Sequence, residues 1–169
     1  MIPLFLDIDG VLSPDKDTGD RDDPVTFLRE THVIAVGQFV TLFGLHVVIS
    51  STWREYLSAA KIQECLRAKG FGNDVFDTTP ILKFNYDGWG SGTRQEPRGV
   101  EIGLWLIQHP EVTNLVILDD LQESEFYPLG RHLVKVNPHL GVGLNHLRYA
   151  AKVLKRPLDR DGLRKKLGR

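Results

Sequence analysis

The sequence predicts an α/β domain, a Rossmann-like three-layer sandwich in which a mainly parallel sheet lies between two layers of helices. Short apolar runs alternate along the chain with longer amphipathic stretches. Strands separated by helical segments favour a parallel sheet, because parallel neighbours need long crossover connections. The 169 residues include 41% hydrophobic and 25% charged residues, which is typical of one folded domain.

Four apolar runs are the expected strands, at residues 4–8, 46–49, 115–118 and 132–136. The first three consist almost entirely of apolar residues, as buried parallel strands do. The fourth ends at Asn137-Pro138, which stops a strand because proline cannot donate to the ladder.

Four amphipathic stretches between and after these runs are the expected helices, at about 30–44, 53–69, 97–109 and 143–156. Gly70 follows the second, and Pro97 opens the third, as helix termini commonly require. Right-handed crossovers then place helices on both faces of the sheet.

Composition excludes several classes of protein and partner. A formal net charge of -1 gives no overall attraction to nucleic acid or anionic lipid, so any such binding must come from a local patch. Cys65 is the single cysteine, which excludes an internal disulfide and a Cys-rich zinc cluster. The first residues carry no signal-peptide pattern, no apolar stretch is long enough to span a bilayer, and we expect a reducing, cytoplasmic location with no membrane partner.

Polar residues directly follow three of the expected strands. These segments are Asp7-Ile8-Asp9-Gly10, Ser50-Ser51-Thr52 and Asp119-Asp120. Because ligands of open parallel sheets bind beyond the carboxyl ends of the strands, the three segments are expected to meet at one edge.

These residue types favour phosphoryl transfer. Alternation along an extended chain puts Asp7 and Asp9 on the same side, where one carboxylate can attack phosphorus and the other can move protons. Such carboxylates repel a phosphate, so a divalent cation is needed, and Asp119-Asp120 supplies further oxygens that suit Mg²⁺. Taken alone, Asp-x-Asp-Gly is more often a turn or a calcium loop, but the calcium-loop pattern does not continue here.

The same segments resemble the signature motifs of haloacid dehalogenase (HAD) superfamily phosphohydrolases over residues about 2–137. The resemblance rests on residues 7–12 (Asp-Ile-Asp-Gly-Val-Leu), on a strand that ends in Ser50, on a basic residue before the next signature strand, and on residues 115–120 (Leu-Val-Ile-Leu-Asp-Asp). Val11 departs from the pattern, since many members carry threonine there.

The resemblance implies a role for each site residue. Asp7 would be the nucleophile, Asp9 the general acid and base, and Ser50 a phosphate-binding hydroxyl. The implied Mg²⁺ ligands are Asp7, Asp9, Asp119 and Asp120.

The basic residue of the third signature has two candidates. Arg98 opens an expected helix, where its guanidinium and the helix N-terminus can both face a phosphate. Lys83 is the alternative, although its apolar neighbours fit a strand or hairpin. A surface pair of Arg98 with Glu101 is the structural alternative to phosphate binding.

Two further residues join the candidate phosphate-binding set. Ser51 stands beside Ser50, although a hydroxyl in a Ser-Ser-Thr segment before a helix is also a natural N-cap. Arg54 in a first helical turn opposes the helix dipole, which indicates an anionic neighbour, either the substrate phosphate or the aspartate cluster.

The expected substrate is large. Neither the gap at residues 13–30 nor the gap at 70–98 can hold a cap domain of the kind that encloses small substrates in this superfamily. An open site admits nucleic-acid ends or proteins.

Two other features favour nucleic acid. Phe84, Tyr86, Trp89 and Arg94 can stack bases and hold phosphates, or else cover the core as a hairpin. A basic C-terminal tail covers about residues 157–169 and either contacts nucleic acid or is merely solvated.

The segments at residues 50–54 (Ser-Ser-Thr-Trp-Arg) and 98–102 (Arg-Gly-Val-Glu-Ile), the latter followed by Trp105-Leu106, resemble those of uncapped HAD domains of nucleic-acid repair, such as the 3′-phosphatase domains of polynucleotide kinases. We expect one domain over residues 1–169 that acts as a Mg²⁺-dependent phosphomonoesterase through an aspartyl-phosphate, on DNA or RNA ends that carry a 3′-phosphate. The alternatives are a nucleotidase, another small-molecule or protein phosphatase, and a non-catalytic nucleic-acid-binding domain.

Overall fold

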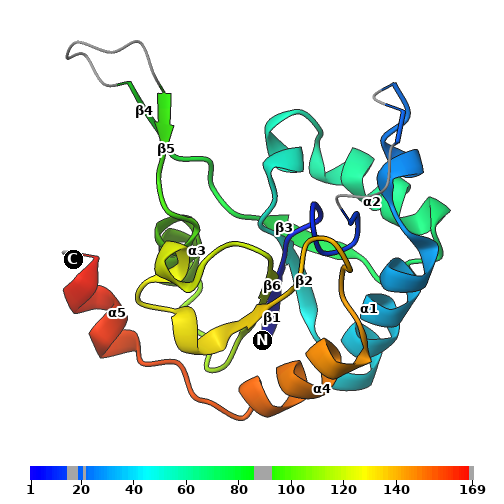
Figure 1. Ribbon diagram of the computed structural model, residues 1–169. Helices are drawn as coiled ribbons and strands as arrows, with labels where there is room; N and C mark the ends of the chain where they lie inside the picture. The colour runs from blue at the N-terminus through cyan, green and yellow to red at the C-terminus, as the bar shows by residue number, and fades with distance from the viewer. Residues whose placement is uncertain (15–18, 21, 86–92, 168–169) are drawn as a thin grey trace.

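Five strands form one parallel sheet in the order β3-β2-β1-β6-β7 (Figure 1). The strands are β1 (Pro3–Leu6), β2 (His46–Ile49), β3 (Val75–Thr78), β6 (Val116–Asp119) and β7 (Leu133–Lys135). The structure is a computed structural model that describes residues 1–14, 19–20, 22–85 and 93–167. Every pairing in this sheet is parallel, which confirms the predicted fold class.

Helices cover both faces of the sheet. The apolar side chains of the strands alternate between two cores, as the pleat requires. Leu4 and Leu6 belong to the core that packs on α1 (Glu30–Phe43), α2 (Ala59–Ala68) and α4 (Leu144–Val153). Phe5 belongs to the other core, which packs on α3 (Arg98–Gln108) and α5 (Arg160–Lys166), and its ring meets the ring of Trp105 edge to face at 5.2 Å. None of the helices in the described part of the chain is long and apolar enough for a membrane crossing.

The strand order reverses direction at β1, in the centre of the sheet. β1 lies between β2 and β6. The chain therefore adds β2 and β3 on one side of β1 and later adds β6 and β7 on the other side. This reversal is the point at which open α/β sheets bind ligands. Residues that directly follow β1 and β6 therefore lie side by side.

The predicted helix at 53–69 is wrong as a single element. A 3-10 helix, η2 (Thr52–Glu55), comes first, and α2 starts at Ala59. Ser58 separates them, because its hydroxyl accepts a hydrogen bond from the Lys61 amide at 3.2 Å and caps α2.

The segment between β2 and α3 contains elements that the apolar pattern does not reveal. Strand β3 is a half-buried edge strand, and its Asp77 and Thr78 interrupt any apolar run. β4 (Lys83–Asn85) and β5 (Thr93–Gln95) pair as an antiparallel hairpin that projects from the sheet (Figure 1). The described residues between β3 and α3 form no helix, in agreement with the predicted absence of a cap domain.

The proposed aromatic surface of this hairpin lies mostly outside the described residues. Tyr86 and Trp89 fall in the range 86–92, and the side chains of Phe84 and Arg94 are likewise not described. Base stacking there stays a prediction.

Part of the basic C-terminal segment is fixed to the domain. Leu163 of α5 is 3% exposed and belongs to the core beneath α3. Arg160 donates to the carbonyl oxygens of Leu106, His109 and Val112 at 2.7–3.3 Å, which satisfies acceptors at and beyond the end of α3. The segment 157–167 is therefore no free tail, and its Arg160 is committed to the fold.

Gly99 lets α3 approach the backbone of Phe126 closely. A Cβ at this position would lie 2.7 Å from the carbonyl carbon of Phe126, in the 3-10 helix η3 (Glu123–Phe126). We expect Gly99→Ala to lower the free energy of unfolding by about 1–3 kcal/mol, since the backbone must move to admit the methyl group. Urea denaturation measures this, with Gly72→Ala as control because a Cβ at Gly72 has no atom within 4 Å. Equal stability of the two variants would contradict the prediction.

Candidate active site

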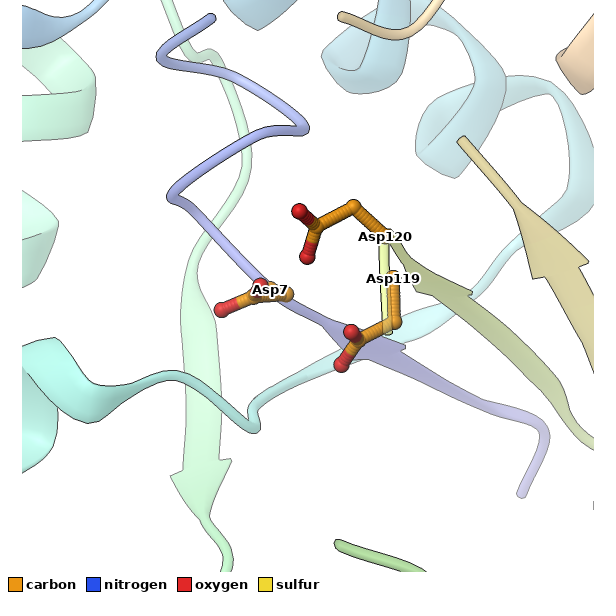
Figure 2. A group of neighbouring side chains, drawn as sticks. All are labelled: Asp7, Asp119 and Asp120. Carbon is orange, nitrogen blue, oxygen red and sulfur yellow. The ribbon is translucent and has the colours of Figure 1, made fainter. Parts of the chain in front are cut away.

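Three carboxylates gather beyond the ends of β1 and β6 (Figure 2). Asp7 follows β1 directly, and its amide donates to the Leu118 carbonyl of β6 at 3.0 Å. Asp119 ends β6 and Asp120 follows it. Each residue offers a carboxylate oxygen, and these oxygens lie within 4.8 Å of one another. The sequence prediction that these three residues meet is confirmed.

A tight loop after β1 makes room for the third carboxylate. The Ile8 carbonyl accepts hydrogen bonds from the amides of residues 11, 12 and 13 at 2.8–3.2 Å, so the chain turns sharply. Gly10 has φ of 70°, which L-residues with a side chain rarely adopt. A Cβ there would lie 2.5 Å from Asp120 Oδ2. Glycine is thus required both for the turn and for the space of Asp120.

Burial makes the charged forms of two of these carboxylates costly. Asp7 is 5% exposed and Asp119 is fully buried. Burial raises the pKa of Asp7 well above its ordinary value, and the neighbouring Asp119 raises it further. Burial also raises the pKa of Asp119 to about 6. A cation at this point would relieve both the desolvation and the mutual repulsion.

The residues present fit a hard divalent cation. Asp119 Oδ1 accepts a hydrogen bond from the Leu121 amide at 3.0 Å. Its second oxygen, Oδ2, is buried and has no hydrogen-bond partner among the described residues. Three carboxylates with one unsatisfied oxygen form a donor set that suits Mg²⁺ rather than a softer metal.

Arg98 is the basic residue that reaches this cluster. It is the first residue of α3, is 7% exposed, and donates to the Ser50 carbonyl. Its positive charge lowers the pKa of both Asp7 and Asp119 against the effect of burial. The alternative candidate, Lys83, instead pairs with Glu55, and its side chain is 48% exposed.

The two serines after β2 take different positions. The Ser50 hydroxyl oxygen is buried and has no hydrogen-bond partner in the described part of the chain. The Ser51 side chain hydrogen-bonds Asp7, which counteracts the raised pKa of that carboxyl. Ser51 also caps η2 by accepting from the Trp53 amide at 3.5 Å, as the N-cap alternative predicted. Ser50 is therefore the hydroxyl that is left for a ligand.

The structure contradicts the prediction that Arg54 binds phosphate. Its guanidinium donates to the carbonyls of Ser51 and Thr79, and it pairs with Glu101 of α3. The side chains of this ion pair are 2% and 0% exposed. The anionic neighbour of Arg54 is thus Glu101, which is neither of the two predicted anions, and its burial excludes the predicted Arg98–Glu101 surface pair.

The Arg54–Glu101 pair joins η2 to α3 beneath the site. We expect Arg54→Met to destabilise the protein by about 3–5 kcal/mol, because it leaves the Glu101 carboxylate buried without its partner. The double variant Arg54→Met, Glu101→Leu should recover most of this loss, since both charges are then gone. Chemical denaturation of the single and double variants measures the difference. A double variant no more stable than the single one would contradict this account.

The Asp9 carboxylate lies apart from the three-carboxylate group. Asp9 is exposed, and its oxygens accept hydrogen bonds from Trp53 Nε1 at 3.0 Å and from the Thr52 hydroxyl at 3.4 Å. The structure therefore does not place the Asp9 side chain as a metal ligand, in contrast to the prediction. Its position at the open end of the site suits proton exchange with a substrate.

Sequence reasoning missed the residues that hold other site residues. Trp53 and Thr52 orient Asp9, and Glu101 neutralises Arg54. Thr52 and Trp53 could have been found from the sequence, because they directly follow Ser51. Glu101 could not be assigned to Arg54 from the sequence, because the two residues are 47 positions apart.

One family model matches the chain, with the description "HAD domain in Swiss Army Knife RNA repair proteins", over residues 3–147. No curated protein and no solved structure matches. The matched range contains the whole sheet, the three carboxylates, Ser50 and Arg98. The chain therefore belongs to this family and is a HAD-superfamily domain of the nucleic-acid-repair type.

Proposed function

We propose that this protein is a Mg²⁺-dependent phosphomonoesterase that removes a terminal phosphate, in the first place a 3′-phosphate, from nucleic-acid ends. One observation carries the proposal: the buried Asp7 carboxylate has an oxygen within 4.8 Å of oxygens of Asp119 and Asp120, and the positive charge of Arg98 lowers its pKa against the effect of burial. A carboxylate so placed beside a basic group and further carboxylates suits attack on a phosphate.

In the first step an Asp7 oxygen attacks phosphorus. The bond between phosphorus and the ester oxygen of the substrate breaks, and protonated Asp9 gives its proton to that leaving oxygen. The phosphoryl group is then bonded to Asp7 as an aspartyl-phosphate. Arg98 and the Ser50 hydroxyl, which has no partner within the described ranges, hydrogen-bond the phosphoryl oxygens, whose charge grows during the transfer.

In the second step water hydrolyses this intermediate. Asp9, now ionised, takes a proton from the attacking water, and the bond between phosphorus and the Asp7 oxygen breaks. Inorganic phosphate leaves, and Asp7 and Asp9 return to their starting forms. The hydrogen bonds from Trp53 and Thr52 hold the Asp9 carboxylate in one place through both steps.

The metal would be held by Asp7, Asp119 and Asp120. When bound, Mg²⁺ supplies positive charge that lets the carboxylates approach a phosphate dianion. The protein's own contribution is to bury Asp7 and Asp119 and to leave Asp119 Oδ2 without another partner among the described residues.

The choice of nucleic acid rests on access and on the family. The described residues form no cap over the carboxyl ends of the strands, so a polymer end can enter. The family description names RNA repair proteins, which favours RNA over DNA as the polymer.

A panel of substrates tests the proposal. Phosphate release is measured with Mg²⁺ and with EDTA from a 3′-phosphorylated RNA, its DNA counterpart, the 5′-phosphorylated RNA, mononucleotides and a phosphopeptide. We expect the highest kcat/KM for the 3′-phosphorylated RNA and no release in EDTA. Preference for mononucleotides or the phosphopeptide would overturn the substrate, and no release from any substrate by folded protein would favour a non-catalytic binding domain.

Arg98 and Lys83 give a direct comparison of the two basic candidates. We expect Arg98→Gln to lower kcat by about 10²–10³-fold, since a donor to the transferring phosphoryl group is lost. Lys83→Gln should leave kcat unchanged, because Lys83 pairs with Glu55. Steady-state kinetics on the preferred substrate measure both, and the reverse order of effects would exclude Arg98.

A further inference from the structure

An open pocket of about 470 Å³ lies beside the outer edge of the sheet, and none of the three carboxylates lines it. Strand β7 and helix α4 contribute to its lining, together with the turn before β7. We call it the β7 pocket and define it by six of its lining residues: Glu123, Arg131, Lys135, Asn145, Tyr149 and Arg156. The catalytic proposal uses none of them.

The β7 pocket combines positive charge with an exposed aromatic ring. Three of the six residues are basic and one, Glu123, is acidic. The Arg156 guanidinium donates to the Arg131 carbonyl at 2.7 Å and lies 5.7 Å from the centre of the Tyr149 ring. Tyr149 itself is 43% exposed. The cation and the ring are therefore held in place before any ligand arrives, which lowers the entropy cost of binding.

A buried neighbour reports the positive potential at this edge. His132 is 1% exposed, and its pKa is lowered to about 4, first by burial and then by the charges of Arg131 and Arg156. The same positive charges that disfavour protonation of the buried His132 imidazole would attract an anion in the pocket.

The pocket adjoins the candidate active site through the sheet. Lys135 of β7 pairs in register with Asp119 of β6, and neighbouring strands lie about 4.8 Å apart. β7 is an edge strand of the described sheet, so no further strand covers this side. A chain whose end reaches Asp7 can therefore continue past Lys135 into the β7 pocket.

We propose that the β7 pocket binds the single-stranded nucleic acid that precedes the terminal phosphate, with Lys135 and Arg156 at backbone phosphates and Tyr149 stacked on a base. Phosphodiesters match the spaced positive charges, and any base offers a face to the tyrosine ring. This inference rests on the proposed function, because it takes the strand end to lie at the three carboxylates.

Two variants test it on two substrates. Lys135→Gln with Arg156→Gln removes two charges, and Tyr149→Leu removes the ring. Each is compared with wild type in kcat/KM for a 3′-phosphorylated single-stranded RNA and for p-nitrophenyl phosphate, which is too small to reach both sites. The matched control is Arg164→Gln with Lys165→Gln, two exposed charges on α5. Thermal denaturation verifies that each variant folds, since Arg156 also bonds the Arg131 carbonyl.

We expect kcat/KM for the RNA to fall about tenfold in Tyr149→Leu, as the loss of one stacked base implies, while the p-nitrophenyl phosphate value stays the same. The double variant Lys135→Gln, Arg156→Gln loses two phosphate contacts. In a plot of the logarithm of its RNA association constant against the logarithm of the salt concentration, the slope should be smaller by about 1.4 than for wild type. The α5 control should change neither quantity.

Three results would overturn the inference: unchanged RNA kinetics, an equal loss on both substrates, or an equal loss in the α5 control. Fluorescence anisotropy with the same RNA in EDTA measures RNA binding without hydrolysis, and so tests the β7 pocket separately from the catalytic proposal. If wild type hydrolyses neither substrate, the proposed function fails, yet weaker RNA binding by the pocket variants would still support the pocket. An acidic peptide that binds the pocket more tightly than RNA would replace the nucleic acid as its ligand.

Discussion

Asp7→Asn is expected to abolish phosphate release, with kcat/KM at least about 10³-fold lower than in wild type. The amide cannot attack phosphorus, and it also removes one of the three carboxylates that would hold the cation. The variant should nevertheless fold, because an amide removes a carboxylate whose charged form burial disfavours, as its raised pKa reports. Phosphate release on the preferred substrate and a thermal melt measure the two effects.

The matched control for this variant is Asp74→Asn. Asp74 is an exposed residue that pairs with Arg67 on the surface, so the same change of carboxylate to amide should alter neither activity nor stability measurably. Residual turnover of Asp7→Asn above about a hundredth of wild type would indicate that another group attacks phosphorus, and the assignment of the nucleophile would fail.

The second large effect concerns metal-dependent stability. Wild-type protein should melt at a higher temperature when Mg²⁺ is added, because a cation that binds the native state alone stabilises it by mass action. Asp119→Asn should lose this increase, since Asp119 supplies the buried oxygen that has no other partner among the described residues. The activity of Asp119→Asn in Mg²⁺ should also fall to the level of wild type in EDTA.

The pH dependence of the metal-free protein has a definite sign. The pKa of Asp119 is raised by burial from its ordinary value of 3.8 to about 6. The native state therefore holds this proton more tightly than the unfolded state does, and the resulting stability is fully present below pH 3.8 and lost as the pH rises through 6. At neutral pH, metal-free Asp119→Asn should be more stable than wild type, on the order of 1–3 kcal/mol.

Melting temperatures of wild type and Asp119→Asn between pH 4 and 8, with Mg²⁺ and with EDTA, measure both quantities. In EDTA the two curves should separate as the pH rises from about 4 to 6 and should run parallel above pH 6, and Mg²⁺ should bring wild type back up while leaving the variant unchanged. Asp74→Asn again serves as the control for a lost carboxylate. Retention of the Mg²⁺ effect in Asp119→Asn would place the cation elsewhere.

Local patterns in the sequence determined the sheet and the position of the site. The runs that became β1, β2 and β6 are almost entirely apolar because both faces of these strands are covered by helices. Since parallel strands end at a common edge, the polar residues directly after them had to meet, and Asp7, Asp119 and Asp120 do so. Strand β3 escaped this reasoning because it is a half-buried edge strand with polar residues of its own.

The tertiary structure alone decided which charged side chains face the site. Arg54 lies in the short 3-10 helix η2 and Arg98 is the first residue of α3, and the sequence does not distinguish their partners. Glu101, one helical turn after Arg98, forms a buried ion pair with Arg54 and neutralises its charge. Arg98 is therefore the arginine of the two whose charge acts on the carboxylates. Local spacing encodes the backbone path, but the pairing of buried charges depends on which distant elements pack together, and each buried charge must find its partner there.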